Sequence, residues 1–206
     1  MPATDDTRER LLDAAGAILA RDGFRAARVR DICAAADVNL AAVSYHFGDK
    51  LGLYRAVFAH AFAIAGPSMA GLPVGGSPAE RLTAWVHDFV LRILDDGKPA
   101  WIAKLMAREM SDPTEVLDEL VEHGIRPHFA ELQATVRALV PGADAATLRR
   151  CALSVVAQCV FYHHSRPVIE RLHPRWRLTT AEAERIAAHI ARFSLAGLAA
   201  IAEDGA

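Results

Sequence analysis

The sequence predicts an all-α protein, with an N-terminal three-helix helix-turn-helix domain at 1–60 and a larger helical domain at 61–206. Apolar residues recur at helical spacing along most of the chain, and β-branched residues rarely alternate with polar ones. No hairpin signal such as Asn-Gly separates two apolar runs. Prolines and glycines cluster at 66–78, which makes this stretch the best candidate boundary.

The composition points to a soluble protein of the cytosol. The net charge of −2 argues against bulk coating of nucleic acid, although it leaves room for a local basic patch. Cys33, Cys151 and Cys159 fit no zinc spacing and are expected to be reduced. The N-terminus lacks the features of a signal peptide, and no apolar run approaches the roughly 20 residues of a membrane span. We therefore expect a cytoplasmic protein without membrane contact.

The first helix is predicted at 7–23, with Asp6 or Thr7 as its N-cap and Gly23 as its C-terminal glycine. Its apolar residues fall on one stripe of a helical wheel: Leu11, Ala14, Ala15, Ile18 and Leu19. Such a stripe packs the helix against its neighbours.

Two short helices follow, VRDICAAA at 29–36 and LAAVSYHF at 40–47, with three residues between them. Asp37 is expected to adopt the left-handed conformation that ends the first, and Asn39 is expected to cap the second. A long helix followed by two short ones and a tight turn is typical of a helix-turn-helix unit, whose second helix lies in the DNA major groove.

The second short helix has two different faces. Val43 and Phe47 share one face, with Val38 beneath them, and are expected to pack on the first helix. The opposite face carries small and polar side chains: Ala41, Ala42, Tyr45 and His46. Alanines let a backbone approach base edges, whereas a phenol or an imidazole can donate to phosphates. Lys50, at the start of the next helix, adds an anion site.

Spacing alone leaves another interpretation open. A helical hairpin with one alanine-rich face also occurs in ordinary bundles, and residues 25–58 carry only 5 Lys+Arg against 3 Asp+Glu.

The segment GFRAARVRDICAAADVNLAAVSYHFGDKLGLYRAVF resembles the DNA-binding domain of TetR-family transcriptional regulators. The match covers about residues 7–60 and rests on Gly23-Phe24, Ile32, Val38, Tyr45-His46-Phe47, Lys50 and Leu53-Tyr54. The resemblance implies an all-α homodimer, usually a repressor, that binds double-stranded operator DNA and releases it when a small-molecule effector binds. The DNA-binding residues predicted with it are Arg28, Arg30, Asn39, Leu40, Ala41, Ala42, Ser44, Tyr45, His46 and Lys50.

Four positions depart from the family pattern. Arg28 stands where a Thr or Ser usually caps the second helix, and Asp37 stands where glycine is usual in the turn. Leu51 replaces a common glutamate. Ser44 matters most, since the family often has a tyrosine there and one phosphate contact is expected to be lost or remade.

Longer helices are predicted at 49–65, 79–96, 98–110, 114–140, 145–165 and 180–203, with loops at 141–142 and 166–178. Pro127 predicts a kink near Gly124. The last two helices are apolar around much of their circumference, which is typical of a deep monomer core or of an oligomer seam. The small residues of 180–203 would allow close helix approach, so we favour a homodimer through these two helices.

REMSDPTEVLDELVEHGIRPHFAEL and SVVAQCVFYHHSRP are similar to the ligand domain of the CecR-like branch of the family. We therefore expect a pocket for a small hydrophobic or amphipathic effector, mostly apolar with a few polar anchors. The candidate lining is Trp85, Phe89, Trp101, Met106, Glu109, Phe129, Gln158, Phe161 and Tyr162. In the competing interpretation the aromatics are ordinary core and Arg108-Glu109 is an ion pair.

No pattern predicts catalysis, a cofactor or a metal site. HExxH, GxSxG, GxGxxG and P-loop motifs are absent. His163 and His164 are neighbours that point about 100° apart on a helix, and His123 and His128 are five residues apart, so neither pair suits a shared ion. The remaining rivals are a helical small-molecule carrier without DNA function and an enzyme with an unrecognised catalytic group.

Overall fold

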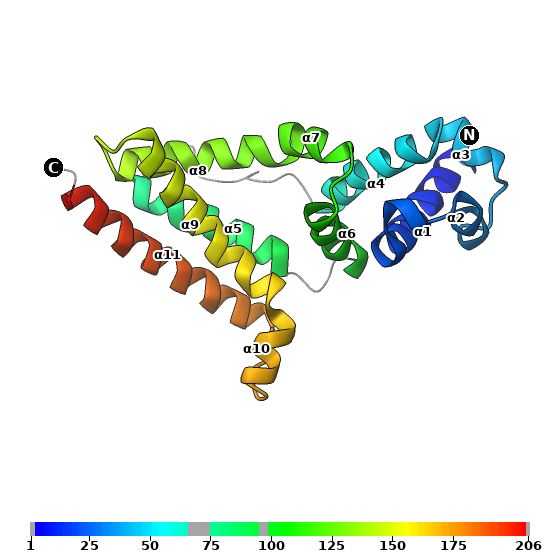
Figure 1. Cartoon of the computed structure of the whole chain (residues 1–206). Helices are drawn as coiled ribbons and strands as arrows, with labels where there is room; N and C mark the ends of the chain where they lie inside the picture. The colour runs from blue at the N-terminus through cyan, green and yellow to red at the C-terminus, as the bar shows by residue number, and fades with distance from the viewer. Residues whose placement is uncertain (1–2, 66–74, 95–98, 205–206) are drawn as a thin grey trace. The chain divides into compact units, whose positions relative to one another are not determined.

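The computed structural model describes residues 3–65, 75–94 and 99–204, which form helices and connecting turns without a strand (Figure 1). The all-α prediction is confirmed. The chain forms two compact units, Met1–Gly66 with Asp96–Gly124, and Pro67–Asp95 with Ile125–Ala206. The stretch predicted as the boundary lies mostly outside the described residues, and the linear division at residue 60 remains a prediction.

The first unit contains α1 (Ala3–Ala26), α2 (Val29–Ala35), α3 (Ala41–Phe47), α4 (Lys50–Ala65), α6 (Ala100–Ser111) and α7 (Val116–Leu120). Helix α1 packs against α2, α4 and α6, and α3 packs against α4. Its fully buried apolar side chains include Leu11, Leu12, Ile32, Leu53, Val57 and Leu105. Three-helix DNA-binding folds need such a core because their helices are too short to be stable alone.

Helix α1 is longer than predicted, so Asp6 and Thr7 lie inside it rather than at its N-cap. The expectation for Gly23 is confirmed, because φ of 81° and ψ of 164° interrupt the helix there. Glycine tolerates this left-handed φ without a Cβ clash. The predicted stripe is buried except for Ala14, which is half-buried.

The second unit contains α5 (Pro78–Leu94), α8 (Arg126–Leu139), α9 (Ala145–His164), α10 (Arg166–Leu172) and α11 (Thr180–Asp204). Helices α5, α8, α9 and α11 bury one continuous apolar core, and α11 runs along α5 (Figure 1). Within the described ranges, one helix segment, Thr180–Glu203, has the length and apolar composition of a membrane span. Core helices pass the same test, and Ile186 and Ile190 of this helix are buried in the unit.

Two further predicted elements differ from the structure. The helix expected at 114–140 is divided, because a π-helical turn at Val121–Ile125 separates α7 from α8. This turn lies at the predicted kink and ends two residues before Pro127, which cannot donate a backbone hydrogen bond. The loop expected at 166–178 was wrong in its first half, where α10 forms. Pro167 lies in the first turn of α10, where a missing N–H leaves no bond unmade.

Candidate nucleic-acid interface

The turn between α2 and α3 is closed by backbone hydrogen bonds at the end of α2. Asp37 has φ of 53°, which confirms the predicted left-handed residue. Its N–H donates to the Ala34 carbonyl at 3.3 Å, and the Val38 N–H donates to the Cys33 carbonyl at 3.0 Å. These two bonds make a Schellman motif, which usually has glycine in the left-handed position. The motif reverses the chain and directs it into α3.

Both ends of α3 are fixed by polar groups. The Asn39 Oδ1 accepts from the Ala41 N–H at 2.9 Å, so Asn39 caps the helix as predicted, although Leu40 already has helical dihedral angles. Gly48, with φ of 79°, ends the helix, and its N–H donates to the Ser44 carbonyl. Asp49 Oδ1 then accepts from the Gly52 N–H at 2.7 Å and starts α4.

A close backbone approach holds α3 against the start of α4. A Cβ on Gly52 would lie 2.0 Å from the Phe47 carbonyl oxygen, so no side chain fits there. Sequence reading missed this position, since a glycine inside a predicted helix looks like a mild defect. Only the distance between two successive helices reveals its role.

Helix α3 presents one buried side and one free side. Val43 is 2% exposed, whereas Tyr45 is 79% exposed and Leu40 is 56% exposed. Ala41 and Ser44 are also exposed, and Ala42 and His46 are half-buried. The predicted outward face is thus largely open, and Leu40 belongs to the open side. The Tyr45 and His46 rings meet edge to face at 4.9 Å between centroids.

The three predicted cations lie in different surroundings. Arg28 is exposed and its side chain forms no cap on α2, and Arg30 donates to the neighbouring Asp31 at 3.3 Å. The Lys50 ammonium donates to the Arg25 carbonyl at 3.4 Å and lies 4.8 Å from the centre of the Phe24 ring. Burial lowers the pKa of Lys50. This side chain is therefore held on the protein, with donors left over for an anion.

The predicted pocket residues are divided between the two units. Trp101, Met106 and Glu109 belong to the first unit, and the other six belong to the second. Glu109 is completely buried and accepts hydrogen bonds from Tyr54 and Thr114, so it is neither the ion-pair partner of Arg108 nor an open polar anchor. Its separation of 55 residues from Tyr54 left no signal in the sequence.

In the second unit, Trp85 is a core side chain, 3% exposed, whose Nε1 donates to the His128 carbonyl at 3.2 Å. The Phe89 ring contacts Trp85 in a tilted arrangement, with 4.9 Å between ring centroids, and Phe129 packs on the same core. Gln158 donates to Ser194 of α11 at 3.2 Å. Phe161 is 57% exposed, with Tyr162 half-buried beside it. Trp85 thus belongs to the apolar core of the second unit, and Phe89 and Phe129 pack against that core.

Over the described ranges, no group of three or more His, Cys, Asp or Glu side chains could hold a metal ion. His163 and His164 have ring centroids 6.4 Å apart. Burial raises the pKa of all three cysteine thiols, that of Cys159 to about 12.

Comparison with known proteins agrees with this geometry. Residues 11–57 match the bacterial regulatory proteins of the tetR family, and residues 78–200 match the C-terminal domain of the HTH-type transcriptional dual regulator CecR. The HTH-type transcriptional repressor NicS of Pseudomonas putida is 24% identical over 173 residues, which cover 79% of this chain and 78% of NicS.

Two solved structures share the fold. HlyIIR, a hemolysin II transcriptional regulator, aligns with a TM-score of 0.63 at 19% identity, over 90% of this chain and 97% of that chain. FadR from Bacillus subtilis, in complex with stearoyl-CoA, aligns with a TM-score of 0.64 at 13% identity, over 89% and 97%. The helix-turn-helix and the helical part that follows it define a DNA-binding transcription regulator. The chain belongs to the TetR family, in its CecR-like branch.

Proposed function

We propose that this regulator is a cytoplasmic homodimeric repressor that binds a near-palindromic operator and is released by a small-molecule effector. The observation that carries the DNA-binding part is the open face of α3, anchored on one side by Val43 and free on the other. Ala41 and Ala42 have short side chains, so the backbone of α3 can come close to the base edges of DNA. Tyr45 and His46 supply donors for phosphates, which set register rather than sequence.

The proposed DNA-binding set includes three further cations. Arg28 is the N-cap residue of α2, Arg30 lies in the first turn of α2, and Lys50 is the first residue of α4, so a helix N-terminus adds to its anion site. Asn39, Leu40 and Ser44 complete the proposed DNA-binding set. Ser44 is exposed and carries only a short hydroxyl, so we expect Tyr45 to supply the phenolic contact that the family usually makes from the neighbouring position.

Two apolar stripes support the homodimer. Leu153 and Phe161 of α9 are 50% and 57% exposed and lie eight residues apart on one side of the helix. Phe193 and Ile201 of α11 are 63% and 37% exposed at the same spacing, with Gly197 midway between them. A Cβ on Gly197 would meet nothing within 4 Å, so this side of α11 is open for close approach of another helix. A second copy is the occupant that these stripes fit.

The effector part of the proposal rests on the family and on one relative. FadR was solved with stearoyl-CoA, a long amphipathic molecule. We propose a small hydrophobic or amphipathic effector for this chain, near the aromatic group Trp85, Phe89 and Phe129. An effector acts only through unequal affinity for the DNA-bound and free conformations.

Selection from a random-sequence DNA pool with the full-length protein tests the proposal. We expect enrichment of an inverted repeat whose half-sites lie about 10 base pairs apart, or a multiple of that. Arg30→Ala and Tyr45→Ala should each weaken binding to the selected site, and stearoyl-CoA serves as the first probe for release. No enrichment of any DNA would favour a helical small-molecule carrier.

Mass measurement by light scattering tests the seam separately. Phe193→Asp should convert the dimer to a monomer, because it places a charge in an apolar interface. Met110→Asp, which alters an exposed apolar residue of α6, serves as the control and should leave the mass unchanged. A wild-type protein that is monomeric at all concentrations would refute the homodimer.

A further inference from the structure

Two adjacent side chains at the end of α6 bind different helices of the first unit. Glu109 is fully buried, and its Oε2 accepts a hydrogen bond of 2.7 Å from the Tyr54 hydroxyl on α4. Its Oε1 accepts from the backbone N–H and the hydroxyl of Thr114, at 2.8 and 2.9 Å. A buried carboxylate is tolerated when donors satisfy it in this way. One carboxylate therefore joins α4, α6 and the turn before α7.

Tyr54 extends this connection to the proposed DNA-binding surface. Burial raises the pKa of Tyr54, and the hydrogen bond to Glu109 raises it further, so the hydroxyl stays protonated and remains a donor. The Tyr54 ring lies 4.8 Å from the Phe24 ring, and the Phe24 ring carries the Lys50 ammonium at 4.8 Å. An unbroken series of contacts thus leads from Glu109 to Lys50.

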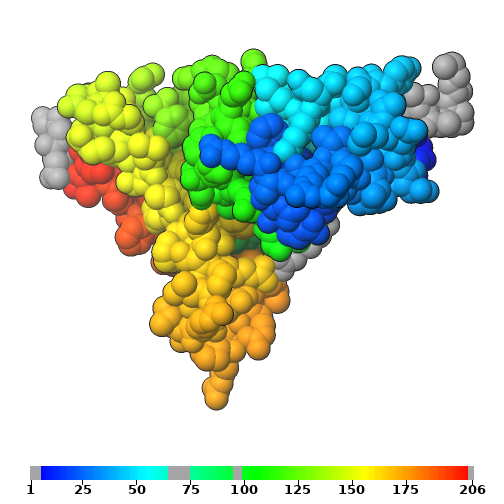
Figure 2. Space-filling view, turned by 45° about the vertical axis from the view of Figure 1, so that its right-hand side comes forward, coloured from blue at the N-terminus to red at the C-terminus, as the bar shows by residue number. Residues whose placement is uncertain are grey.

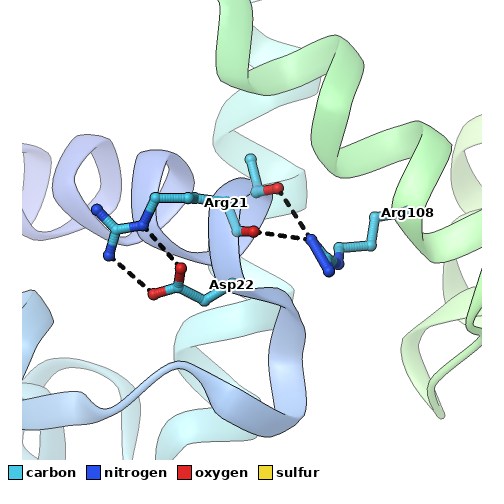
Figure 3. A network of polar contacts seen from close by, with 4 residues as sticks. Arg21, Asp22 and Arg108 are labelled. Carbon is cyan, nitrogen blue, oxygen red and sulfur yellow. Dashed lines mark hydrogen bonds and ion pairs between the residues drawn. The ribbon is translucent and has the colours of Figure 1, made fainter.

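Arg108 holds the end of α1 (Figure 3). Its Nη1 donates to the Arg21 carbonyl at 2.9 Å and to the Ala20 carbonyl at 3.4 Å, which are among the last acceptors before the Gly23 break. A cation at a helix C-terminus satisfies carbonyls that lack helical partners. Gly23 gives it room, because a Cβ there would lie 2.8 Å from the Arg108 Nε.

A third contact fixes the start of α6 on α1. Trp101 lies so close to Gly16 that a Cβ on this glycine would be 2.6 Å from the indole ring. The His60 ring stacks on Trp101, with 6.4 Å between centroids, and its Nε2 contacts Asp13 of α1 at 3.2 Å. Helix α6 is therefore attached to α1 and α4 along its length, inside one compact unit.

We propose that Arg108 and Glu109 are positioning residues for DNA binding, although neither belongs to the helix-turn-helix. Glu109 holds Tyr54, and through Phe24 it holds Lys50 in place to receive a phosphate. Arg108 holds the end of α1 from which Phe24 and Arg25 follow. The inference rests on the proposed DNA-binding function and deepens it.

The first experiment compares full-length Tyr54→Phe, Glu109→Gln and the double variant for binding to the selected DNA site. Each single change leaves a buried group unpaired or mispaired, so we expect about a tenfold loss of affinity. The double variant should lose no more than either single one, because both break the same link. Glu119→Gln removes an exposed ion pair between α7 and Arg55 of α4 and is the matched control, with less than about a twofold change expected.

The salt dependence separates positioning from general stability. If Lys50 loses its phosphate, the slope of log affinity against log salt should fall by about one unit in Tyr54→Phe, as in Lys50→Ala. In a Lys50→Ala background, Tyr54→Phe should have no further effect. Folded variants that bind like the wild type, or an undiminished loss in the Lys50→Ala background, overturn the proposal.

Hydrogen exchange tests the positioning role of Glu109 and Tyr54 without DNA. In Tyr54→Phe and Glu109→Gln, amides of residues 50–54 should exchange at least several-fold faster, while those of α5 and α11 stay unchanged. Unchanged exchange at 50–54 refutes the positioning role even if the wild type binds no DNA. If these amides exchange faster in the two variants but the wild type selects no DNA, the contact between Glu109 and Tyr54 is supported and the proposed function is refuted instead.

Discussion

The two units are stabilised by different means. In the first, α2 and α3 have seven residues each and depend on single backbone positions: the left-handed Asp37, the left-handed Gly48 and the close approach at Gly52. In the second, long helices bury apolar stripes such as Leu82, Val86 and Val90 of α5. Short helices need defined ends because each has few residues to bury, whereas long helices gain stability from buried volume. We therefore expect a single added atom to destabilise the proposed DNA-binding unit, whereas the stability of the second unit should depend on how well its core is packed.

Gly52→Ala is expected to have the largest effect. The new Cβ would lie 2.0 Å from the Phe47 carbonyl oxygen, so α3 or α4 must shift. We expect the free energy of unfolding to fall by about 4 kcal/mol and binding to the selected DNA site to be lost. Urea denaturation and a gel shift measure both. Gly75→Ala, with open space around it, is the control and should change neither.

Leu132→Ala tests the dependence of the second unit on volume. Leu132 of α8 is completely buried, and the change should cost about 3 kcal/mol in urea denaturation. Leu132→Met keeps the volume and should cost less than about 1.5 kcal/mol. If the methionine variant is as unstable as the alanine variant, the second unit depends on exact shape and the contrast between the units disappears.

The stability of the second unit should fall with acidification. Burial lowers the pKa of His128, and the charge of Arg92 lowers it further. Burial and the neighbouring His164 lower the pKa of His163. Because the unfolded chain has the ordinary histidine pKa of about 6.5, this stability is complete above that pH and is lost as pH falls below it.

Urea midpoints between pH 7.5 and 5 would show this trend. We expect His128→Gln and His163→Gln to flatten it, with a smaller effect than Leu132→Ala. His189→Gln alters an exposed histidine of α11 and serves as the control. A wild-type midpoint that is constant down to pH 5 would contradict the assignment.

Asp37→Gly should give the smallest effect and the opposite sign. Asp37 holds φ of 53°, which glycine adopts without strain. Relief of strain, less the added freedom of the unfolded chain, should raise the free energy of unfolding by up to about 1 kcal/mol. DNA affinity should stay the same, since Asp37 belongs to the turn. Thermal unfolding and a gel shift check the two parts.

Local patterns explain which parts of the fold could be predicted. Helical periodicity, Gly23, Asp37 and Asn39 act within a few residues, so the sequence alone indicates the helices and the helix-turn-helix. The π-helical turn before Pro127 was foreseen as a kink for the same reason. Helix α10 was missed because Pro167 suggests a loop, although proline is favoured in a first turn.

Distant contacts explain what could not be predicted. Tyr54 lies 55 residues from Glu109, and Arg21 lies 87 residues from Arg108, so no spacing rule connects these partners. The same applies to Trp101 over Gly16. The candidate site was outlined by residue types and by family resemblance, whereas two side chains proposed to hold it in place, Arg108 and Glu109, come from α6. Helix α10 has no buried residue, and it lies at the surface in the space-filling view (Figure 2).

The position of Lys50 has a consequence for the entropy of binding. A surface lysine normally loses about 2 kcal/mol of rotamer freedom when a partner immobilises it. Lys50 has already lost much of this freedom, because its ammonium rests on the Phe24 ring and the Arg25 carbonyl. A phosphate that binds to Lys50 would meet a preorganised donor. Part of the entropic cost of ordering the Lys50 side chain was already incurred when the protein folded.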